Sequence, residues 1–363
     1  MLKVVSSTSM NMQCILSSIS LCVFLTFTVN IHPVNSDQLA YDGSIESLMG
    51  TETIPESKDI VYEPEFNLSA RLYLPENTAE SQKLPLLVYY HGGGFIIESP
   101  FSPTYHNFLN ILVSEANVIV VSVEYRLTRL FKNKLPVAYD DSWTALEWVA
   151  SHLNGDGPED WLNQHADFQQ VFLSGDSSGA NIAHQMVLRL GTQGTVEGFA
   201  VSGMILCHPF FWGQDAIPGE TTDTNIRSLV ADEWQFVCPN CTLDHPWINP
   251  ATDPSLALIA TPRLQVFVSE LDILQERGWY YAQNLRQRGW SGHQDVIDFQ
   301  GEGHVFHLNN LTSRNSTILR NRIVTFINEK WSDASVLMEP SCDSSNFMVG
   351  CRPLHIPKIS SDA

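Results

Sequence analysis

The sequence predicts an α/β fold in which a mostly parallel sheet carries helices on both faces. From Ser69 onward, short β-branched or aromatic runs alternate with longer segments of helical spacing, as in parallel strands joined by crossover helices. Apolar residues make up 44% of the 363 residues and charged residues only 17%, so a folded core is expected rather than a disordered chain. No repeat or Gly- or Ser-rich linker interrupts residues 69–331, which indicates one doubly wound domain.

The expected strands are short segments rich in β-branched or aromatic residues, as in a sheet buried on both faces. In chain order they are Arg71–Leu74, Leu86–Tyr90, Val118–Glu124, Val171–Ser174, Met204–Cys207, Leu264–Ser269 and Val296–Phe299.

The expected helices lie between or after these strands and show apolar residues at helical spacing. The clearest begins at Ser178, with apolar residues at positions 182, 183, 186, 187 and 190. In chain order the helices are Tyr105–Glu115, Val137–His152, Ser178–Leu190, Glu276–Arg288 and Ser313–Glu329.

The two ends of the chain differ from this pattern. Residues 1–36 resemble a secretory leader, with the basic Lys3, an apolar run from Ile15 to Val29 and small residues before a cut after Ser36. This favours a secreted protein or one in the endomembrane lumen; an uncleaved anchor, an untranslated extension and a cytoplasmic location are the alternatives. Residues 37–68 are expected to be an irregular lead-in, and residues 332–363 a loose tail.

Cysteines and glycosylation signals bear on the compartment. Seven cysteines occur, two of them in the leader, so an odd number remains and at least one thiol is expected to stay free. Cys342–Cys351 and Cys238–Cys241 are both candidate disulfides, and because no second Cys pair lies near the latter we expect no zinc. The sequons at Asn67, Asn240, Asn310 and Asn315 support secretion only weakly.

The net charge narrows the range of partners. Asp and Glu number 40 against 20 Lys and Arg, a formal net charge of −20. Phosphate backbones and anionic lipid head groups are repelled by such a surface, so nucleic acid and stable membrane insertion are not expected. We expect a monomer or weak dimer, with neither cofactor nor metal.

A candidate nucleophile follows the strand that ends at Ser174. Gly175-Asp176-Ser177-Ser178-Gly179 lies between this strand and the helix after it, which is the strand, sharp turn and helix context that a G-x-S-x-G nucleophile elbow requires. The glycines leave room for the turn, and the Ser177 hydroxyl would project at the helix N-terminus. A structural Gly-Ser turn is the alternative.

A glycine-rich strand exit is the second candidate feature. His91-Gly92-Gly93-Gly94-Phe95 follows the strand that ends at Tyr90. Glycines let the backbone approach a substrate carbonyl and aim N–H donors at a developing oxyanion, joined by the amide of Ser178. No G-x-G-x-x-G or P-loop pattern follows, so phosphate binding is disfavoured.

A serine nucleophile needs a base, and the base needs an orienting carboxylate. His304 and Asp272 each follow a predicted strand, at the edge of the sheet where ligands bind, and the order Ser177, Asp272, His304 is the one found in α/β hydrolases. His307 is an alternative to His304 as the base, but we expect it to have a packing role. Glu270 is an alternative to Asp272 as the orienting carboxylate. Asp140 and Asp141 are expected to be structural, capping amides of the helix that they open.

With these motifs assembled, the sequence resembles the plant carboxylesterases of the α/β-hydrolase fold, relatives of hormone-sensitive lipase that include 2-hydroxyisoflavanone dehydratases and gibberellin receptors. The resemblance covers most of residues 58–331 and implies Ser177 as nucleophile with Asp272 and His304. It also implies amide donors at Gly92, Gly93 and Ser178, and residues 37–68 as part of the acyl-pocket cap. The segments that carry it are Lys58–Tyr62, Ala70–Pro75, His91–Phe95, Glu124–Leu127, Tyr139–Trp143, Gly175–Asn181 and Gly303–Phe306.

The sequence departs from this family in three places. Where relatives usually have Ala-Pro-Glu-His-Pro, residues 128–134 form a longer, basic loop; the lead-in between Pro55 and Lys58 is shorter than usual; and the tail after Trp331 has no familiar counterpart. The family also seldom begins with a leader.

The function expected from these observations is a serine carboxylesterase that hydrolyses small, largely apolar esters through an acyl-enzyme. A dehydratase of 2-hydroxyisoflavanones is the alternative, although such relatives typically carry Thr at the nucleophile position. A non-catalytic hormone receptor is a third possibility, but the resemblance implies that the receptors have lost the histidine that stands here as His304.

Overall fold

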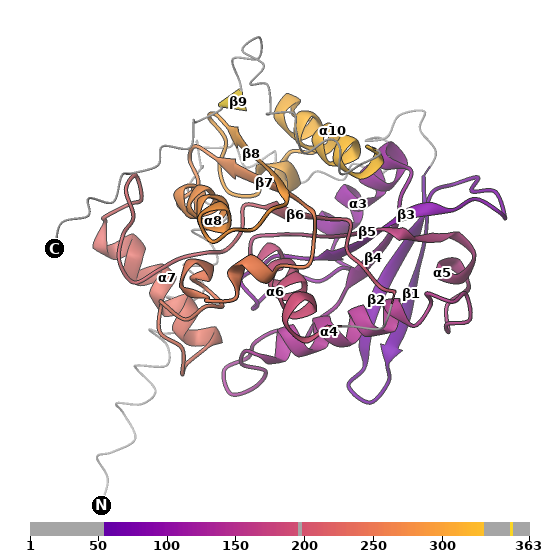
Figure 1. Ribbon diagram of the computed structural model, residues 1–363, viewed down its shortest axis with the longest axis horizontal. Coiled ribbons are helices and arrows are strands. Elements are labelled where there is room, and N and C mark those ends of the chain that lie inside the picture. The colour runs from indigo at the N-terminus through magenta and orange to yellow at the C-terminus, as the bar shows by residue number, and fades with distance from the viewer. Residues whose placement is uncertain (1–53, 195–197, 330–348, 351–363) are drawn as a thin grey trace, which may run out of the picture.

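The fold is built on a nine-stranded sheet, which the computed structural model describes together with its helices over residues 54–194, 198–329 and 349–350. The strand order is β1-β2-β4-β3-β5-β6-β7-β8-β9. The run from β4 to β8 is parallel, whereas β1, β2 and β9 pair antiparallel with their neighbours. Figure 1 shows this sheet passing through the middle of the molecule.

Seven of the nine strands, β2 to β8, follow the expected runs, and β1 and β9 were not expected. In chain order they are β1 (Glu56–Glu63), β2 (Leu68–Leu74), β3 (Leu84–Tyr90), β4 (Ile119–Val123), β5 (Ala166–Asp176), β6 (Gly203–Cys207), β7 (Arg263–Ser269), β8 (His293–Phe299) and β9 (Val349–Gly350). Every residue of β4, β6 and β7 is buried, and β4 and β6 accordingly read as mostly apolar runs without alternation.

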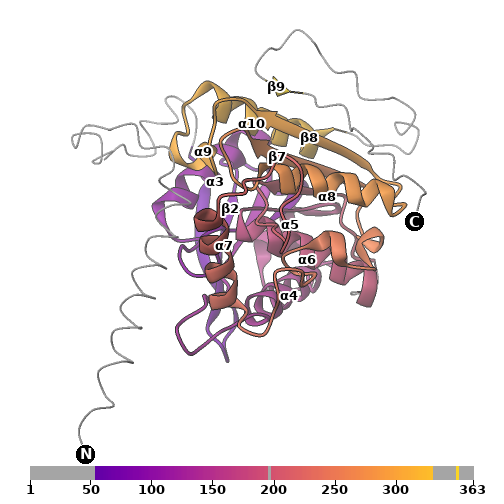
Figure 2. The same cartoon turned by 90° about the vertical axis from the view of Figure 1, so that its left-hand side faces the viewer.

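Helices cover both faces of the sheet (Figures 1 and 2). On one face, α3 (Pro103–Ala116), α9 (Phe306–Asn309) and α10 (Arg314–Asn328) share a core, and the Arg320 guanidinium of α10 pairs with Glu115 of α3 at 2.9 Å. The other face is covered by α4 (Val137–Ala150), α6 (Ser178–Gln193) and α8 (Gln275–Gln287), and α7 (Thr224–Val237) packs on the same core. Shorter helical segments are α5 (Asp160–His165), η2 (Pro250–Thr252) and η3 (Leu256–Leu258).

The seven strands and five helices expected from the sequence are confirmed, with ends that differ by a few residues. The lead-in is not irregular throughout, because residues 56–63 form β1, an edge strand whose exposed and charged positions hide its period. The helix α7 was also missed, although Asp223 supplies an N-cap signal: its side chain accepts from the amides of Asn225 and Ile226.

The acidic pair at the start of α4 is structural, but not through capping. Pro136 is the N-cap and no side chain caps the helix. Asp141 instead accepts from the Arg126 guanidinium, with Nη2 to Oδ1 at 2.6 Å and Nε to Oδ2 at 2.8 Å. The ion pair fixes the chain after β4 against α4, so the capping role predicted from the sequence is wrong.

Of the two candidate disulfides, Cys238–Cys241 is formed, and Cys207 is a free, buried thiol. The pair Cys342–Cys351, the leader and most of the tail lie outside the described residues. Within the described ranges, no helix is both long and apolar enough to cross a membrane.

Candidate active site at the carboxyl ends of the strands

Ser177 occupies a tight turn between β5 and α6. Its φ of 52° and ψ of −118° are unusual for a residue other than glycine, and its amide and carbonyl are held by hydrogen bonds to Cys207 O and Phe210 N, at 2.9 and 3.0 Å. A Cβ on Gly179 would overlap the backbone of Tyr90. Only glycine at that position lets α6 pack so closely on β3, which is how the sequence places the Ser177 hydroxyl at the sheet edge.

His304 joins Ser177 to Asp272. Its Nε2 lies 2.9 Å from Ser177 Oγ, and its Nδ1 lies 2.7 Å from Asp272 Oδ2. The second oxygen, Oδ1, accepts from the amide of Leu274 at 2.9 Å, so both oxygens of this buried carboxylate are engaged. The three residues come from the ends of β5, β7 and β8, and the structure brings together the three that sequence spacing selected.

Electrostatics favour a charged aspartate beside the histidine. Burial lowers the pKa of His304, but the charge and hydrogen bond of Asp272 outweigh burial and leave it raised. For Asp272 burial raises the pKa, and the charge and hydrogen bond of His304 reverse this, so the net direction is down. The arrangement therefore stabilises an imidazolium, the form that His304 takes after accepting a proton.

The competing residues occupy other positions. Glu270 accepts from the amide of Gly301 at 2.8 Å, whereas His304 Nδ1 is paired with Asp272. His307 is buried, stacks on His208 and lies edge-on to Phe108, so its expected packing role is confirmed. Burial lowers the pKa of His307 to about 3, which keeps this ring neutral beside His304.

The glycine motif after β3 is fixed by buried hydrogen bonds. The Gly92 amide donates to the Tyr105 hydroxyl at 2.8 Å and to Asp176 Oδ1 at 3.2 Å. This amide faces the protein interior, so its assignment as an oxyanion donor is wrong. The motif pattern alone does not show which of its amides turns inward.

Gly93 and Gly94 remain as donor candidates, with Ser178. Both glycines have positive φ values, 97° and 62°, and the carbonyl of Gly93 accepts from Ile96 and Ile97 in a turn. Among the described residues, none accepts a hydrogen bond from the amides of Gly93, Gly94 or Ser178. They are therefore free to donate to a substrate oxygen.

His91 and Asp176 support this loop rather than reacting. The His91 ring stacks on Tyr125 with 4.3 Å between ring centroids, and burial lowers its pKa to about 4. Asp176 accepts from the hydroxyls of Tyr89 and Tyr105 at 2.9 and 3.0 Å. Burial raises its pKa to about 6, against these hydrogen bonds. Together they hold the loop against the elbow.

The basic loop of residues 128–134 is part of the same assembly. The Thr128 amide donates to Phe95 O, and the Lys134 ammonium donates to Phe236 O at the end of α7 at 2.6 Å. The loop therefore links the glycine motif to α7. In the described part of the chain, no group of three or more His, Cys, Asp or Glu is arranged to hold a metal ion.

A parallel sheet with a serine, a histidine and an aspartate joined at its strand ends defines the class of α/β hydrolases. The model of the α/β hydrolase fold family matches residues 87–308, and the chain belongs to that family.

Curated relatives and solved structures agree with this assignment. The chain is 45% identical over 309 residues to probable carboxylesterase 13 of Arabidopsis thaliana, covering 78% of this chain and 93% of the relative. It is 40% identical to a 2-hydroxyisoflavanone dehydratase of Glycine max, covering 79% and 94%. An esterase from Pyrobaculum calidifontis superposes with a TM-score of 0.65 at 23% identity, covering 86% and 92%, which shows the shared fold.

Proposed function

We propose that the protein is a serine carboxylesterase that hydrolyses small, largely apolar carboxylic esters through an acyl-enzyme. The observation that carries the proposal is the continuous hydrogen-bonded chain from Ser177 Oγ through His304 to Asp272. The carboxylesterase names of the relatives support it.

In the proposed mechanism, Ser177 Oγ attacks the ester carbonyl while His304 Nε2 accepts the hydroxyl proton. Asp272 stabilises the imidazolium, and the amides of Gly93, Gly94 and Ser178 donate to the oxyanion. The imidazolium then protonates the departing alcohol. Water, deprotonated by His304, attacks the acyl-enzyme and releases the acid and Ser177.

The test is hydrolysis of p-nitrophenyl butyrate. Ser177→Ala is expected to lower kcat by roughly 10⁴-fold or more, because nucleophile and base act as a unit. Ser151→Ala, at an exposed serine after α4, is the matched control and keeps full activity. A fluorophosphonate should phosphonylate Ser177 Oγ with loss of fluoride, so the wild type gains the mass of the phosphonyl group and Ser177→Ala does not. Unchanged turnover in Ser177→Ala would refute the mechanism.

The dehydratase relatives define a second candidate function. In that case the same histidine and donors would serve proton abstraction and loss of water rather than acyl transfer. Incubation with a 2-hydroxyisoflavanone and detection of the isoflavone decides between the two. The serine at position 177 favours hydrolysis.

A further inference from the structure

Glu233 on α7 is a buried carboxyl group without a hydrogen-bond partner. Its residue is 6% exposed, and no side chain or amide in the described part of the chain donates to it. The other buried carboxyl groups of the described residues are all paired, namely Asp141, Glu159, Asp176, Glu220, Asp272 and Asp298. A buried carboxyl group without a hydrogen-bond partner lowers the stability of the fold. Its presence here therefore calls for a functional explanation.

The carboxyl group lies against the glycine motif. A Cβ placed on Gly94 would overlap Glu233 Oε1, so the carboxylate is in contact with one of the candidate oxyanion donors. Glu233 and His304 also affect each other's charge: the carboxylate raises the pKa of the imidazole, and the imidazole lowers that of the carboxyl. Glu233 therefore borders the space where a substrate carbonyl would bind.

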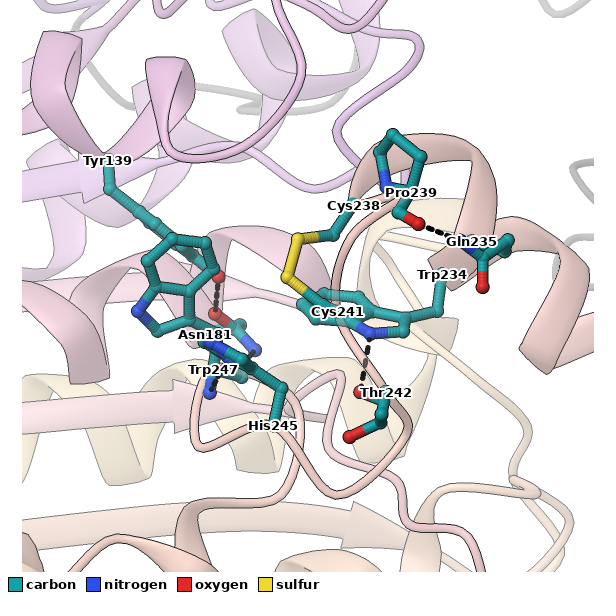
Figure 3. Close-up of a disulfide and its surroundings, with 10 residues drawn as sticks. All are labelled: Tyr139, Asn181, Trp234, Gln235, Cys238, Pro239, Cys241, Thr242, His245 and Trp247. Atoms are coloured by element: carbon teal, nitrogen blue, oxygen red, sulfur yellow. Dashed lines mark hydrogen bonds between the residues drawn. A yellow bond between two sulfur atoms is a disulfide. The ribbon is translucent and has the colours of Figure 1, made fainter.

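The helix that carries Glu233 is held in place on both sides. Figure 3 shows the indole of Trp234, the next residue, donating from Nε1 to Thr242 O at 3.1 Å beside the Cys238–Cys241 disulfide. On the other side, the Leu135 amide donates to Val237 O at 2.9 Å. A side chain on such an anchored helix presents its carboxyl in a fixed position, as a recognition group requires.

The protonation state suits a neutral donor ligand. Burial raises the pKa of Glu233 to about 7, against a smaller opposite effect of His304. Near neutral pH both the acid and the carboxylate are populated, and each can accept a hydrogen bond from a hydroxyl group. A carboxylate substrate would be repelled once Glu233 ionises.

We propose that Glu233 is a specificity-determining residue that accepts a hydrogen bond from a hydroxyl group on the substrate, within a few bonds of the ester carbonyl. The substrate class is then an otherwise apolar ester that carries a hydroxyl on its acyl or alcohol part. This rests on the proposed esterase function and deepens it. Sites built around a buried hydrogen-bonding group discriminate strongly against analogues that leave the group unpaired.

The experiment compares matched esters with and without one hydroxyl. On the acyl side these are p-nitrophenyl 3-hydroxybutyrate and p-nitrophenyl butyrate; on the alcohol side, 2-hydroxyethyl butyrate and ethyl butyrate. Wild type is expected to favour the hydroxyl ester in at least one pair by about tenfold or more in kcat/KM, the effect of one well-placed hydrogen bond to a charged group. In Glu233→Met this ratio is expected to fall to about 1.

Two further variants isolate the carboxyl group. Glu233→Gln has nearly the same shape and can still accept a hydrogen bond, so it should keep part of the preference for the hydroxyl ester. Because glutamine does not ionise, that preference should no longer change as the pH passes about 7. Asp232→Asn, at the exposed neighbouring position on α7, should keep the wild-type ratio. Thermal unfolding shows whether each variant is folded. If Glu233→Met does not fold, the ratio measured with Glu233→Gln decides the test.

The outcomes separate this proposal from the esterase function. Equal turnover within both pairs by wild type, or a preference that survives in a folded Glu233→Met, overturns the role of Glu233 while leaving the esterase intact. Absence of Ser177-dependent hydrolysis of any of the four esters overturns the esterase function, and this proposal with it.

Discussion

Replacing Asp272 by asparagine tests the electrostatic argument for the site most directly. The substitution keeps the size of the side chain and the acceptor for the Leu274 amide, but removes the charge 2.7 Å from His304 Nδ1. An amide NH₂ can donate to Nδ1, and this would place the ring proton on Nε2. His304 would then donate to Ser177 instead of accepting its proton.

The magnitude follows from the charge pair that forms during reaction. Opposite unit charges at about 3 to 4 Å interact by roughly 4 to 6 kcal/mol at an effective dielectric constant of about 20. Every 1.36 kcal/mol or so changes a rate tenfold, so kcat/KM should fall by about 10³- to 10⁴-fold. Asp272 is buried, and solvent would therefore do little to replace its charge.

The assay is the pH profile of kcat/KM for p-nitrophenyl butyrate. His304 acts as a base only when neutral, so activity falls as the pH drops through its pKa. Asp272 raises that pKa, and Asp272→Asn should therefore move the acid limb to lower pH as well as reduce the plateau. The control is Glu270→Gln, which changes the neighbouring acid that accepts from the Gly301 amide. It should leave the acid limb and the plateau of the pH profile unchanged. A folded Asp272→Asn within tenfold of wild type, or a large loss in Glu270→Gln, would refute the assignment.

Two other outcomes are expected. Tyr105→Phe removes the hydroxyl that joins Gly92 to Asp176. Because these groups are then under-satisfied, the variant should lose about 1–3 kcal/mol of stability, and its disturbed glycine loop should lower kcat. The control Tyr280→Phe, on α8, should keep the wild-type stability and kcat. Equal melting temperatures and kcat values for the two variants would contradict this. Expression through a secretory route should yield a product that begins near Asp37 by N-terminal sequencing and loses mass with a glycosidase, since the sequons at Asn67, Asn240 and Asn310 are exposed; an intact Met1 on cytosolic protein would contradict it.

Local sequence signals predicted most of the sheet and its main helices because the strands are buried on both faces. The stretch from Val171 to Leu190 combines an apolar strand, a glycine turn and a helical period, so its structure is determined within about 20 residues. The edge strand β1 gave no such signal, because only Tyr62 among its residues is buried. For α7, the cap and period were present, but its packing partners come from distant segments.

Some residues of the candidate site could be predicted from the sequence and others could not. Ser177, Asp272 and His304 could be selected because each follows a strand, and parallel strands end at one edge of the sheet. Gly92 could not be distinguished from Gly93, because the direction of each amide depends on Tyr105 and Asp176.

The sequence by itself determined seven of the strands, five of the helices, the elbow and the three residues at the sheet edge, since periodicity and glycine turns act over a few neighbouring residues. Only the tertiary structure decided which amides turn inward, how loop 128–134 joins the glycine motif to α7, and that the Glu233 carboxyl lies against Gly94. These features depend on contacts between segments far apart in the chain. Such contacts are fixed by packing and by the pairing of buried polar groups, which no local pattern encodes.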